Sequence, residues 1–249
     1  RVRSSAASDV YKRQQVQSDI IHRSAFWQLP LWLSSPANRA SGEMVFDAER
    51  EIYFPQRPPR PQGEVYRRYD PRIRRMLSFR IADPVSDAER FTRWMNDPRV
   101  EYFWEQSGSL EVQIAYLERQ LTSKHAFPLI GCFDDRPFSY FEIYWAAEDR
   151  IGRHYSWQPF DRGLHLLVGE QQWRGAHYVQ SWLRGVTHYL LLNEPRTQRT
   201  VLEPRIDNQR LFRHLEPAGY RTIKEFDFPH KRSRMVMADR HHFFTEVGL

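Results

Sequence analysis

One histidine stands inside an apolar stretch of the sequence, and a glycine turn follows it within ten residues. The stretch reads Gly163-Leu164-His165-Leu166-Leu167-Val168-Gly169, which is typical of a short buried strand. A neutral histidine with a pKa of about 6.5 can accept a proton, so His165 is a candidate acid–base residue. The sequence leaves open the plainer alternative, a core histidine hydrogen-bonded to the backbone.

The turn after this strand leads directly into a helical pattern. Polar residues 170–174 precede Gly175 and Ala176, and Asn193 ends the pattern. Its apolar positions lie on one helical face: Val179, Trp182, Leu183, Val186 and Leu190. The first N–H groups of a helix have no intrahelical partner, so this arrangement predicts an anion-binding site at the helix start.

Polar residues near two helix starts are further candidates for binding or catalysis. Asp207 could assist proton transfer and Asn208 could contact a cofactor, although either residue is also an ordinary helix N-cap. Arg174 and His177 could contact phosphates at the start of the central helix. Their alternative is a role as solvated turn residues.

A charged turn and three tryptophans complete the set of candidates. His230 and Lys231 could bind phosphates or a substrate carboxylate, and a plain charged hairpin turn is the alternative. Trp104, Trp145 and Trp157 are candidate walls of an acceptor pocket, although large aromatic residues usually belong to the core. No group of His, Cys and carboxylate residues has metal-site spacing, so we expect no metal.

The elements that must position these residues follow from periodicity and turn signals. We expect helices over residues 86–95, 110–121 and 207–215 besides the central one, and strands over 76–82, 127–133, 138–145, 164–168, 199–202, 220–226 and 232–237. This order predicts a mixed α/β or α+β sheet rather than a regular doubly wound one. Glycine motifs for dinucleotides or nucleoside triphosphates are absent from the sequence.

Composition divides the chain into three parts. Residues 9–14 (DVYKRQ) are what a transposon end used in preparing sequencing libraries would encode, so we interpret residues 1–14 as an artefact. Residues 15–72 are irregular and contain a proline-rich connector over residues 53–63. We interpret them as an N-terminal extension and linker, with a peptide ligand for a partner as the alternative. Residues 73–249 are the expected compact domain.

Charge and cysteine usage limit the classes of function. The net charge is +6, but residues 1–14 contribute +3 of it, which leaves +3 for the rest. Basic residues are scattered among acidic ones, so we expect no nucleic-acid partner. The single Cys132 excludes an internal disulfide and fits a reducing compartment. No apolar run approaches the ~18 residues of a membrane span, so we expect a cytoplasmic protein without membrane contact.

The order of elements and the central turn resemble the GNAT superfamily of acyl-CoA N-acyltransferases. In that family the turn reads Gln/Arg-x-x-Gly-x-Gly/Ala, and its amides hold the pyrophosphate of acyl-CoA. Gln172 and Gly175 match, whereas His177 stands where a small residue is usual. The resemblance implies a cofactor site made of Val168, Gln172, Trp173, Arg174, Gly175, Ala176, His177 and Asn208.

The helix after the central one departs from the family pattern at one position. That helix often carries Asn, then Tyr, Gly and Phe at fixed intervals; Asn208, Gly219 and Tyr220 keep the spacing, but Leu215 replaces the tyrosine. In many relatives this tyrosine protonates the departing thiolate. Another group, or water, must do so here.

A closer resemblance is to N-acyltransferases of siderophore biosynthesis, including those that act on N-hydroxylysine in aerobactin assembly. The phrases that carry it lie between residues 57 and 237: RPPRPQGEVY (57–66), GLHLLVG (163–169), EPRIDN (203–208) and EFDFPHKR (225–232). The resemblance implies transfer of an acetyl or related acyl group from acyl-CoA to a hydroxylamine nitrogen. The product would be a hydroxamate that later binds iron, with a siderophore synthetase as a candidate partner.

This chemistry asks little of the protein. A hydroxylamine nitrogen is largely unprotonated near neutral pH, so orientation, one proton acceptor and donors to the carbonyl oxygen suffice. We expect His165 to be the acceptor, assisted by Asp207, with backbone amides of its strand as the donors. Trp104, Trp145, His230 and Lys231 would then bind the substrate.

Two alternatives remain open from the sequence. One is a GNAT enzyme that acts on an ordinary amine, which a carboxylate base able to deprotonate an ammonium would favour. The other is a module that binds CoA without turnover, or that serves as a scaffold through its proline-rich segment. A His177 ring in the pyrophosphate position would favour that module.

Overall fold

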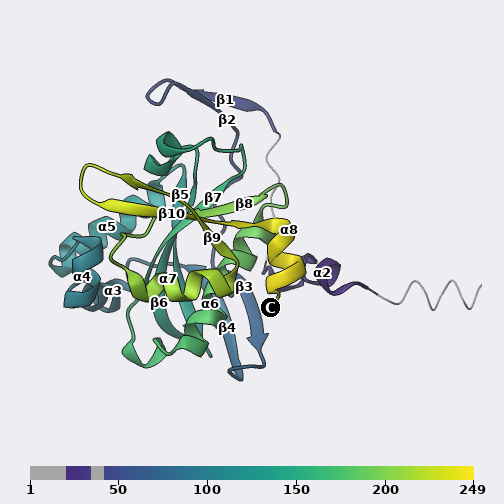
Figure 1. Ribbon diagram of the computed structural model, residues 1–249. Coiled ribbons are helices and arrows are strands. Elements are labelled where there is room, and N and C mark those ends of the chain that lie inside the picture. Colours follow the sequence, from purple (N-terminus) through teal and green to yellow (C-terminus); the bar gives the residue numbers. More distant parts are fainter. Residues whose placement is uncertain (1–20, 35–41) are drawn as a thin grey trace, which may run out of the picture.

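The computed structural model describes residues 21–34 and 42–249. Residues 1–14, interpreted above as an artefact, lie outside the described residues. Eight strands form one sheet in the order β3-β4-β5-β6-β7-β8-β10-β9, antiparallel except for the pair β7–β8 (Figure 1). Their bounds are β3 (Glu64–Asp70), β4 (Arg75–Ile81), β5 (Ala126–Phe133), β6 (Arg136–Trp145), β7 (Arg162–Val168), β8 (Arg199–Leu202), β9 (Tyr220–Asp227) and β10 (Arg232–Asp239). β1 (Met44–Asp47) and β2 (Ile52–Pro55) form a separate antiparallel pair.

Helices cover both faces of the sheet (Figure 1). The α-helices are α2 (Arg23–Phe26), α3 (Ala88–Met95), α4 (Pro98–Trp104), α5 (Leu110–Thr122), α6 (Ala176–Asn193), α7 (Gln209–Leu215) and α8 (Arg240–His242). Shorter turns of other helix types are η1 (Pro30–Trp32), η2 (Arg150–His154), η3 (Gln171–Trp173), η4 (Glu216–Ala218) and η5 (Phe243–Val247). The fold is therefore a mixed α/β sheet, as predicted. None of the described helices is long and apolar enough to cross a membrane.

One hydrophobic core lies on each face of the sheet, so neighbouring residues of a strand contribute side chains to different cores. Phe91, Trp94 and Leu117 of α3 and α5 pack on one face of the sheet, where Tyr140 of β6 meets them. Trp182 and other residues of α6 pack on the opposite face. Because successive strand side chains point to opposite faces, Glu142 and Tyr144 lie on the face of Tyr140. His165 is paired with Glu142 in the β6–β7 register and shares that face.

The parallel strands β7 and β8 diverge soon after they meet. They pair only at Arg162 with Thr200 and at Gly163 with Val201. The rest of β7, from Leu164 to Val168, therefore has no paired β8 residue beside it. The sheet is therefore open beside this part of β7.

The sheet begins earlier in the chain than predicted. Residues 15–72 were expected to be an extension, but β3 pairs along its length with β4, and residue 73 falls in the turn between them. The charges of Arg68 and Asp70 conceal this strand in the sequence. In the structure both are buried and lie 3.3 Å apart, and Tyr66 is fully buried.

Residues 21–34, the N-terminal segment, pack against the central helix α6. The rings of Trp27 and Trp32 are stacked, with centroids 4.6 Å apart, and both contact the ring of His188 in α6. The proline-rich connector contributes residues 53–55 to β2, and residues 56–62 are neither helix nor strand.

Candidate active site

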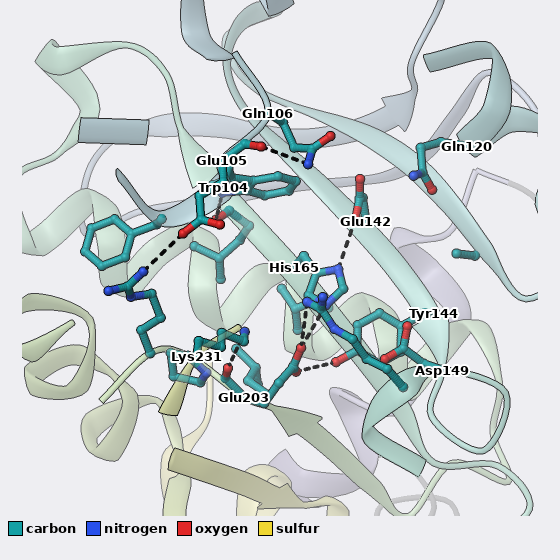
Figure 2. Close-up of a pocket in the computed structure, with 18 of the residues that line it drawn as sticks. Trp104, Glu105, Gln106, Gln120, Glu142, Tyr144, Asp149, His165, Glu203 and Lys231 are labelled. Carbon is teal, nitrogen blue, oxygen red and sulfur yellow. Dashed lines mark hydrogen bonds and ion pairs between the residues drawn. The ribbon is translucent and has the colours of Figure 1, made fainter. Parts of the chain in front are cut away.

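A cavity of about 540 Å³ lies where β7 and β8 diverge, on the face covered by α3, α4 and α5. Its walls come from β6, β7, α4, the C-terminal end of α5, the loop after β8 and the turn between β9 and β10. Trp104, Glu142, His165, Glu203 and Lys231 all line it (Figure 2).

His165 lies between two carboxylates in this cavity. Its Nδ1 is 3.0 Å from Oε2 of Glu142, and its Nε2 is 2.8 Å from Oε1 of Glu203 (Figure 2). Glu142 faces it across the β6–β7 pair, and Glu203 follows β8 directly. The Glu203 side chain is 1% exposed and the His165 side chain 21%, so the imidazole is the part of the pair that solvent and substrate can reach.

Buried tyrosines hold both carboxylates. Glu142 accepts hydrogen bonds from Tyr116 and, at 3.1 Å, from Tyr140. Glu203 accepts one from Tyr144 at 2.7 Å. These donors satisfy the oxygen atoms that His165 does not contact, which is what a buried charge requires.

The electrostatics of the site make His165 a cation. Burial acts to lower its pKa, but the charge of Glu203 and the hydrogen bonds to both carboxylates outweigh burial and raise the pKa to about 10. In turn, His165 keeps the pKa of Glu142 and of Glu203 below the usual value despite their burial. The two carboxylates therefore favour a protonated His165, whereas the sequence, which did not reveal them, led us to expect a neutral, proton-accepting histidine.

Two further cations lie beside Glu203. Arg150 Nη2 is 3.6 Å from Oε1 of Glu203, and Lys231 Nζ donates to the Glu203 backbone carbonyl at 3.0 Å. Burial lowers the pKa of Lys231. Lys231 and His230 both line the cavity, as expected of substrate-binding residues, and the exposed His230 ring stacks on Phe228.

Asp207 does not contact the cluster of His165, Glu142 and Glu203. Its carboxylate accepts a hydrogen bond from Tyr102 at 2.7 Å and pairs with Arg205. The side chain is 41% exposed and is absent from the cavity lining. Glu203, rather than Asp207, is the carboxylate that contacts His165 after β8. The neighbouring Asn208 lines the cavity and also caps α7, accepting from Leu211 N at 3.3 Å.

The tryptophans separate into different roles. Trp104 lines the cavity and donates from Nε1 to the Leu166 carbonyl at 3.3 Å. Trp145 is buried away from the cavity lining, with the guanidinium groups of Arg57 and Arg162 at 4.2 and 4.0 Å from its ring. Trp157 lines a separate cavity of about 310 Å³ near β2.

Some residues of the predicted cofactor turn are buried or bonded to the sheet, and others are exposed to solvent. Arg174 donates to the carbonyl of Val168 at 2.8 Å and to that of Gly169 at 2.9 Å, so its guanidinium is tied to the end of β7. Trp173 is buried and packs on Phe133. Gln172 is exposed.

Gly175 is the N-cap of α6, and no side chain caps this helix. No described backbone carbonyl accepts a hydrogen bond from the N–H of Ala176 or His177, so these donors are available to an anion. The His177 side chain is exposed, with its ring 4.1 Å from that of Tyr178. It lies beside Gly175, where an added Cβ would come within 2.9 Å of its Cε1.

Sequence reasoning missed Glu142, Glu203, Asp149 and Arg150. Glu203 lies in the phrase EPRIDN, where attention to the helix cap favoured Asp207 instead. Glu142 is the one acidic residue within an apolar strand, and a buried carboxylate there requires a partner. Asp149 and Arg150 lie in a polar loop that gave no signal of its own.

Asp149, His165 and Glu203 could each offer a ligand atom to a metal, since these atoms lie within 4.8 Å of one another. The same atoms take part in other interactions. Nε2 of His165 contacts Glu203, and Arg150 lies 3.6 Å from the same carboxylate. A protonated imidazole and a guanidinium both oppose a dication, and the expected absence of a metal remains a prediction.

Comparison with known proteins matches residues 83–228 to the family described as acetyltransferase (GNAT) domain. Over 235 residues the chain is 98% identical to an Escherichia coli protein named N(6)-hydroxylysine O-acetyltransferase, covering 94% of this chain and 75% of that protein. It is 32% identical to a hydroxyornithine transacylase of Ajellomyces capsulatus, covering 94% of this chain and 60% of that one.

Solved structures agree on the fold. An uncharacterised protein of Bacillus halodurans matches with a TM-score of 0.70 and 26% identity, covering 74% of this chain and 94% of that one. An aminoglycoside acetyltransferase solved with coenzyme A matches with a TM-score of 0.60 and 21% identity, covering 67% and 96%. Because the family model matches residues 83–228, more than half of the chain, the chain belongs to the GNAT acetyltransferases.

Proposed function

We propose that this protein transfers an acetyl group from acetyl-CoA to the hydroxylamine nitrogen of N6-hydroxylysine, forming a hydroxamate for siderophore assembly. The observation that carries the proposal is the His165 imidazolium held between Glu142 and Glu203 where β7 and β8 diverge. The names of the Escherichia coli and Ajellomyces capsulatus relatives support an N-hydroxylated amino acid as the acceptor.

The atom that receives the acetyl group is part of the proposal. The Escherichia coli relative is named for transfer to oxygen. Acylation on oxygen gives an ester, whereas acylation on nitrogen gives the hydroxamate, which chelates iron through two oxygen atoms. We propose nitrogen, because it is the more nucleophilic atom of an uncharged hydroxylamine and needs no prior deprotonation.

His165 serves as the acid in this proposal. As the nitrogen attacks, the His165 imidazolium gives its Nε2 proton to the departing CoA thiolate. The neutral ring then accepts the proton of the acylated nitrogen at the same atom. This restores the imidazolium, again 2.8 Å from Glu203, whose pKa it keeps low.

This assignment also accounts for the missing tyrosine. Leu215 is apolar and 2% exposed, so it cannot protonate the thiolate. The His165 imidazolium, kept protonated by the two carboxylates beside it, has a proton to give to the thiolate at the β7–β8 opening.

A donor for the thioester carbonyl is available on β7. Trp104 reaches the Leu166 carbonyl from the open side of the strand. The N–H and C=O of one strand residue point to the same side, so the Leu166 N–H also faces the opening. We propose that this amide receives the developing oxyanion. CoA would reach it from the α6 N-terminus, with its pyrophosphate on the amides of Ala176 and His177.

The carboxylates of the site favour a neutral acceptor. An ordinary amine enters as an ammonium and needs a base to remove its proton. Glu142 and Glu203 have lowered pKa values beside His165, so they are weak bases until that histidine loses its charge. A hydroxylamine is already neutral near pH 7 and avoids this step.

The test is release of CoA thiol from acetyl-CoA with N6-hydroxylysine or lysine as the acceptor, together with the iron-binding colour of the product. We expect turnover with N6-hydroxylysine, a product that forms a ferric hydroxamate complex, and little turnover with lysine. A product that is the O-acetyl ester, or a preference for lysine, would contradict the proposal. Propionyl-CoA and longer acyl-CoAs establish whether acetyl is the preferred group.

The setting of the reaction is part of the same proposal. Acetyl-CoA and N6-hydroxylysine are cytoplasmic metabolites, so we propose a cytoplasmic location. The product is a hydroxamate with a free amino-acid end, which a siderophore synthetase would join to a carboxylic acid.

A further inference from the structure

One arginine that lines the active-site cavity has no ionic partner among the described residues. Arg119 lies in the last turn of α5. The other arginine and lysine side chains of the lining are occupied: Arg150 lies near Glu203, Arg205 pairs with Asp207 and Glu105, and Lys231 donates to the Glu203 carbonyl.

Arg119 is held in place without using its hydrogen-bond donors. Its guanidinium carbon lies 4.9 Å from the centre of the Tyr116 ring, a cation–π contact. Tyr116 is itself fixed through its hydroxyl to Glu142. The guanidinium therefore lies at the cavity with its donor fork free, and Arg119 is exposed enough for a ligand to reach it.

The register of the sheet places Arg119 at the end of the cavity away from the cofactor turn. α5 leads into the start of β5, where Ala126 pairs with Tyr144, and Tyr144 pairs with Gly163 at the start of β7. The turn before α6 joins the opposite end of β7, where Arg174 binds the Val168 carbonyl. If acyl-CoA enters from that turn, the end near Arg119 receives the acceptor.

We propose that Arg119 binds the α-carboxylate of the acceptor, so that the protein selects an N-hydroxylated amino acid over the corresponding N-hydroxydiamine. This inference rests on the proposed function and names the residue that recognises the carboxylate end of the acceptor. The guanidinium fork matches a carboxylate in two parallel hydrogen bonds.

Arg150 does not fit this role. Its Nη2 lies 3.4 Å from Nε2 of His165, at the reacting centre. In N6-hydroxylysine the carboxylate carbon is separated from the reacting nitrogen by the whole side chain. A cation that binds the carboxylate must therefore lie away from His165, and Arg119 lines the cavity from the last turn of α5.

The test compares two acceptors that differ only in the carboxylate, N6-hydroxylysine and N-hydroxycadaverine, with acetyl-CoA. We expect Arg119→Ala to lower kcat/KM for N6-hydroxylysine by roughly 10- to 100-fold through KM, as expected for loss of a charge-assisted pair. N-hydroxycadaverine should be unaffected, and Arg119→Lys should restore part of the loss. Arg221→Ala, at an exposed residue of β9 outside the cavity lining, is the matched control.

Equal loss with both acceptors, or no loss with either, would overturn the inference. A parent protein that prefers N-hydroxycadaverine would overturn it too. Binding of N6-hydroxylysine without acetyl-CoA, followed by the fluorescence of Trp104 and the other tryptophans, gives a readout that does not need turnover. If the parent fails to acetylate either acceptor, the proposed function is wrong. Even then the binding measurement tests the carboxylate site: weaker binding of N6-hydroxylysine by Arg119→Ala supports it, and unchanged binding contradicts it.

Discussion

Nε2 of His165 lies 2.8 Å from Oε1 of Glu203, and this contact joins β7 to the residue that follows β8. The two strands have already diverged at this point. The pair therefore bridges the opening between the two strands, where the proposed reaction would take place.

Removing the charge of Glu203 should slow the reaction and shift its pH dependence. We expect Glu203→Gln to lower kcat by about 10²- to 10⁴-fold, the range for loss of an acid–base residue. Glu203 is the largest influence that raises the pKa of His165, which is about 10 in the parent. Without it the imidazolium loses its proton at lower pH, so the alkaline fall in kcat/KM should begin at lower pH. A pH–rate profile of both proteins measures this.

Asp207→Asn is the control for that experiment. Asp207 is an exposed residue outside the cavity lining, and its ion pair with Arg205 is worth no more than about 1 kcal/mol. Its kcat and alkaline limb should match the parent. A loss in Asp207→Asn as large as in Glu203→Gln would contradict the assignment of Glu203 as the partner of His165.

Acid should weaken the contact between the N-terminal segment and α6. His188 is fully buried, with Nε2 2.6 Å from the Trp27 carbonyl and Nδ1 2.9 Å from the Tyr66 hydroxyl. Nε2 donates to the carbonyl, so Nδ1 accepts from the tyrosine and the ring is neutral. Burial lowers its pKa from 6.5 to about 3.

The unfolded chain therefore binds a proton that the folded protein excludes. This contribution to stability is complete above pH 6.5 and is lost as the pH falls toward about 3. Between pH 7 and pH 4 the parent should lose roughly 3 kcal/mol more than His188→Gln in the free energy of unfolding. Urea denaturation at both pH values measures the difference. Parallel losses in the two proteins would show that His188 does not carry the effect.

Local patterns predicted most of the sheet and its helices, because periodicity and capping act within short segments. α5 begins at Leu110, as expected, and the side chain of its N-cap Ser109 accepts a hydrogen bond from the backbone N–H of Val112. β3 escaped prediction because its charges suggest an exposed segment, whereas Arg68 and Arg72 pair with Asp70 and allow its carboxylate to be buried. The free backbone N–H groups after Gly175 were predictable, because the first N–H groups of any helix lack an intrahelical acceptor.

The acid–base group was predicted only in part, for a physical reason. His165 was visible as a polar residue in an apolar strand, but its protonation depends on Glu142 and Glu203, which lie 23 positions before and 38 positions after it. No local pattern links these three residues. Trp145 shows the converse: it was expected at the pocket, yet two arginines cover its ring. Aromatic residues look alike in sequence whether they line a cavity or support one.

A charge placed at Gly175 should separate the stability of α6 from its ability to bind an anion. Aspartate is a favoured N-cap and its charge suits a helix N-terminus, so Gly175→Asp should keep or slightly raise the Tm. The same charge would repel the pyrophosphate, so the Kd for CoA should rise at least about tenfold, as expected for losing ~1.4 kcal/mol or more. The new Cβ comes within 2.9 Å of the exposed His177 ring, which can move, and lies 3.5 Å from Tyr178 Cδ2, an ordinary contact. Gly175→Asn supplies a neutral cap of the same shape and should weaken CoA binding much less. Calorimetric titration with CoA compares the variants, and equal Kd values for Asp and Asn would mean that the pyrophosphate does not lie at this helix start.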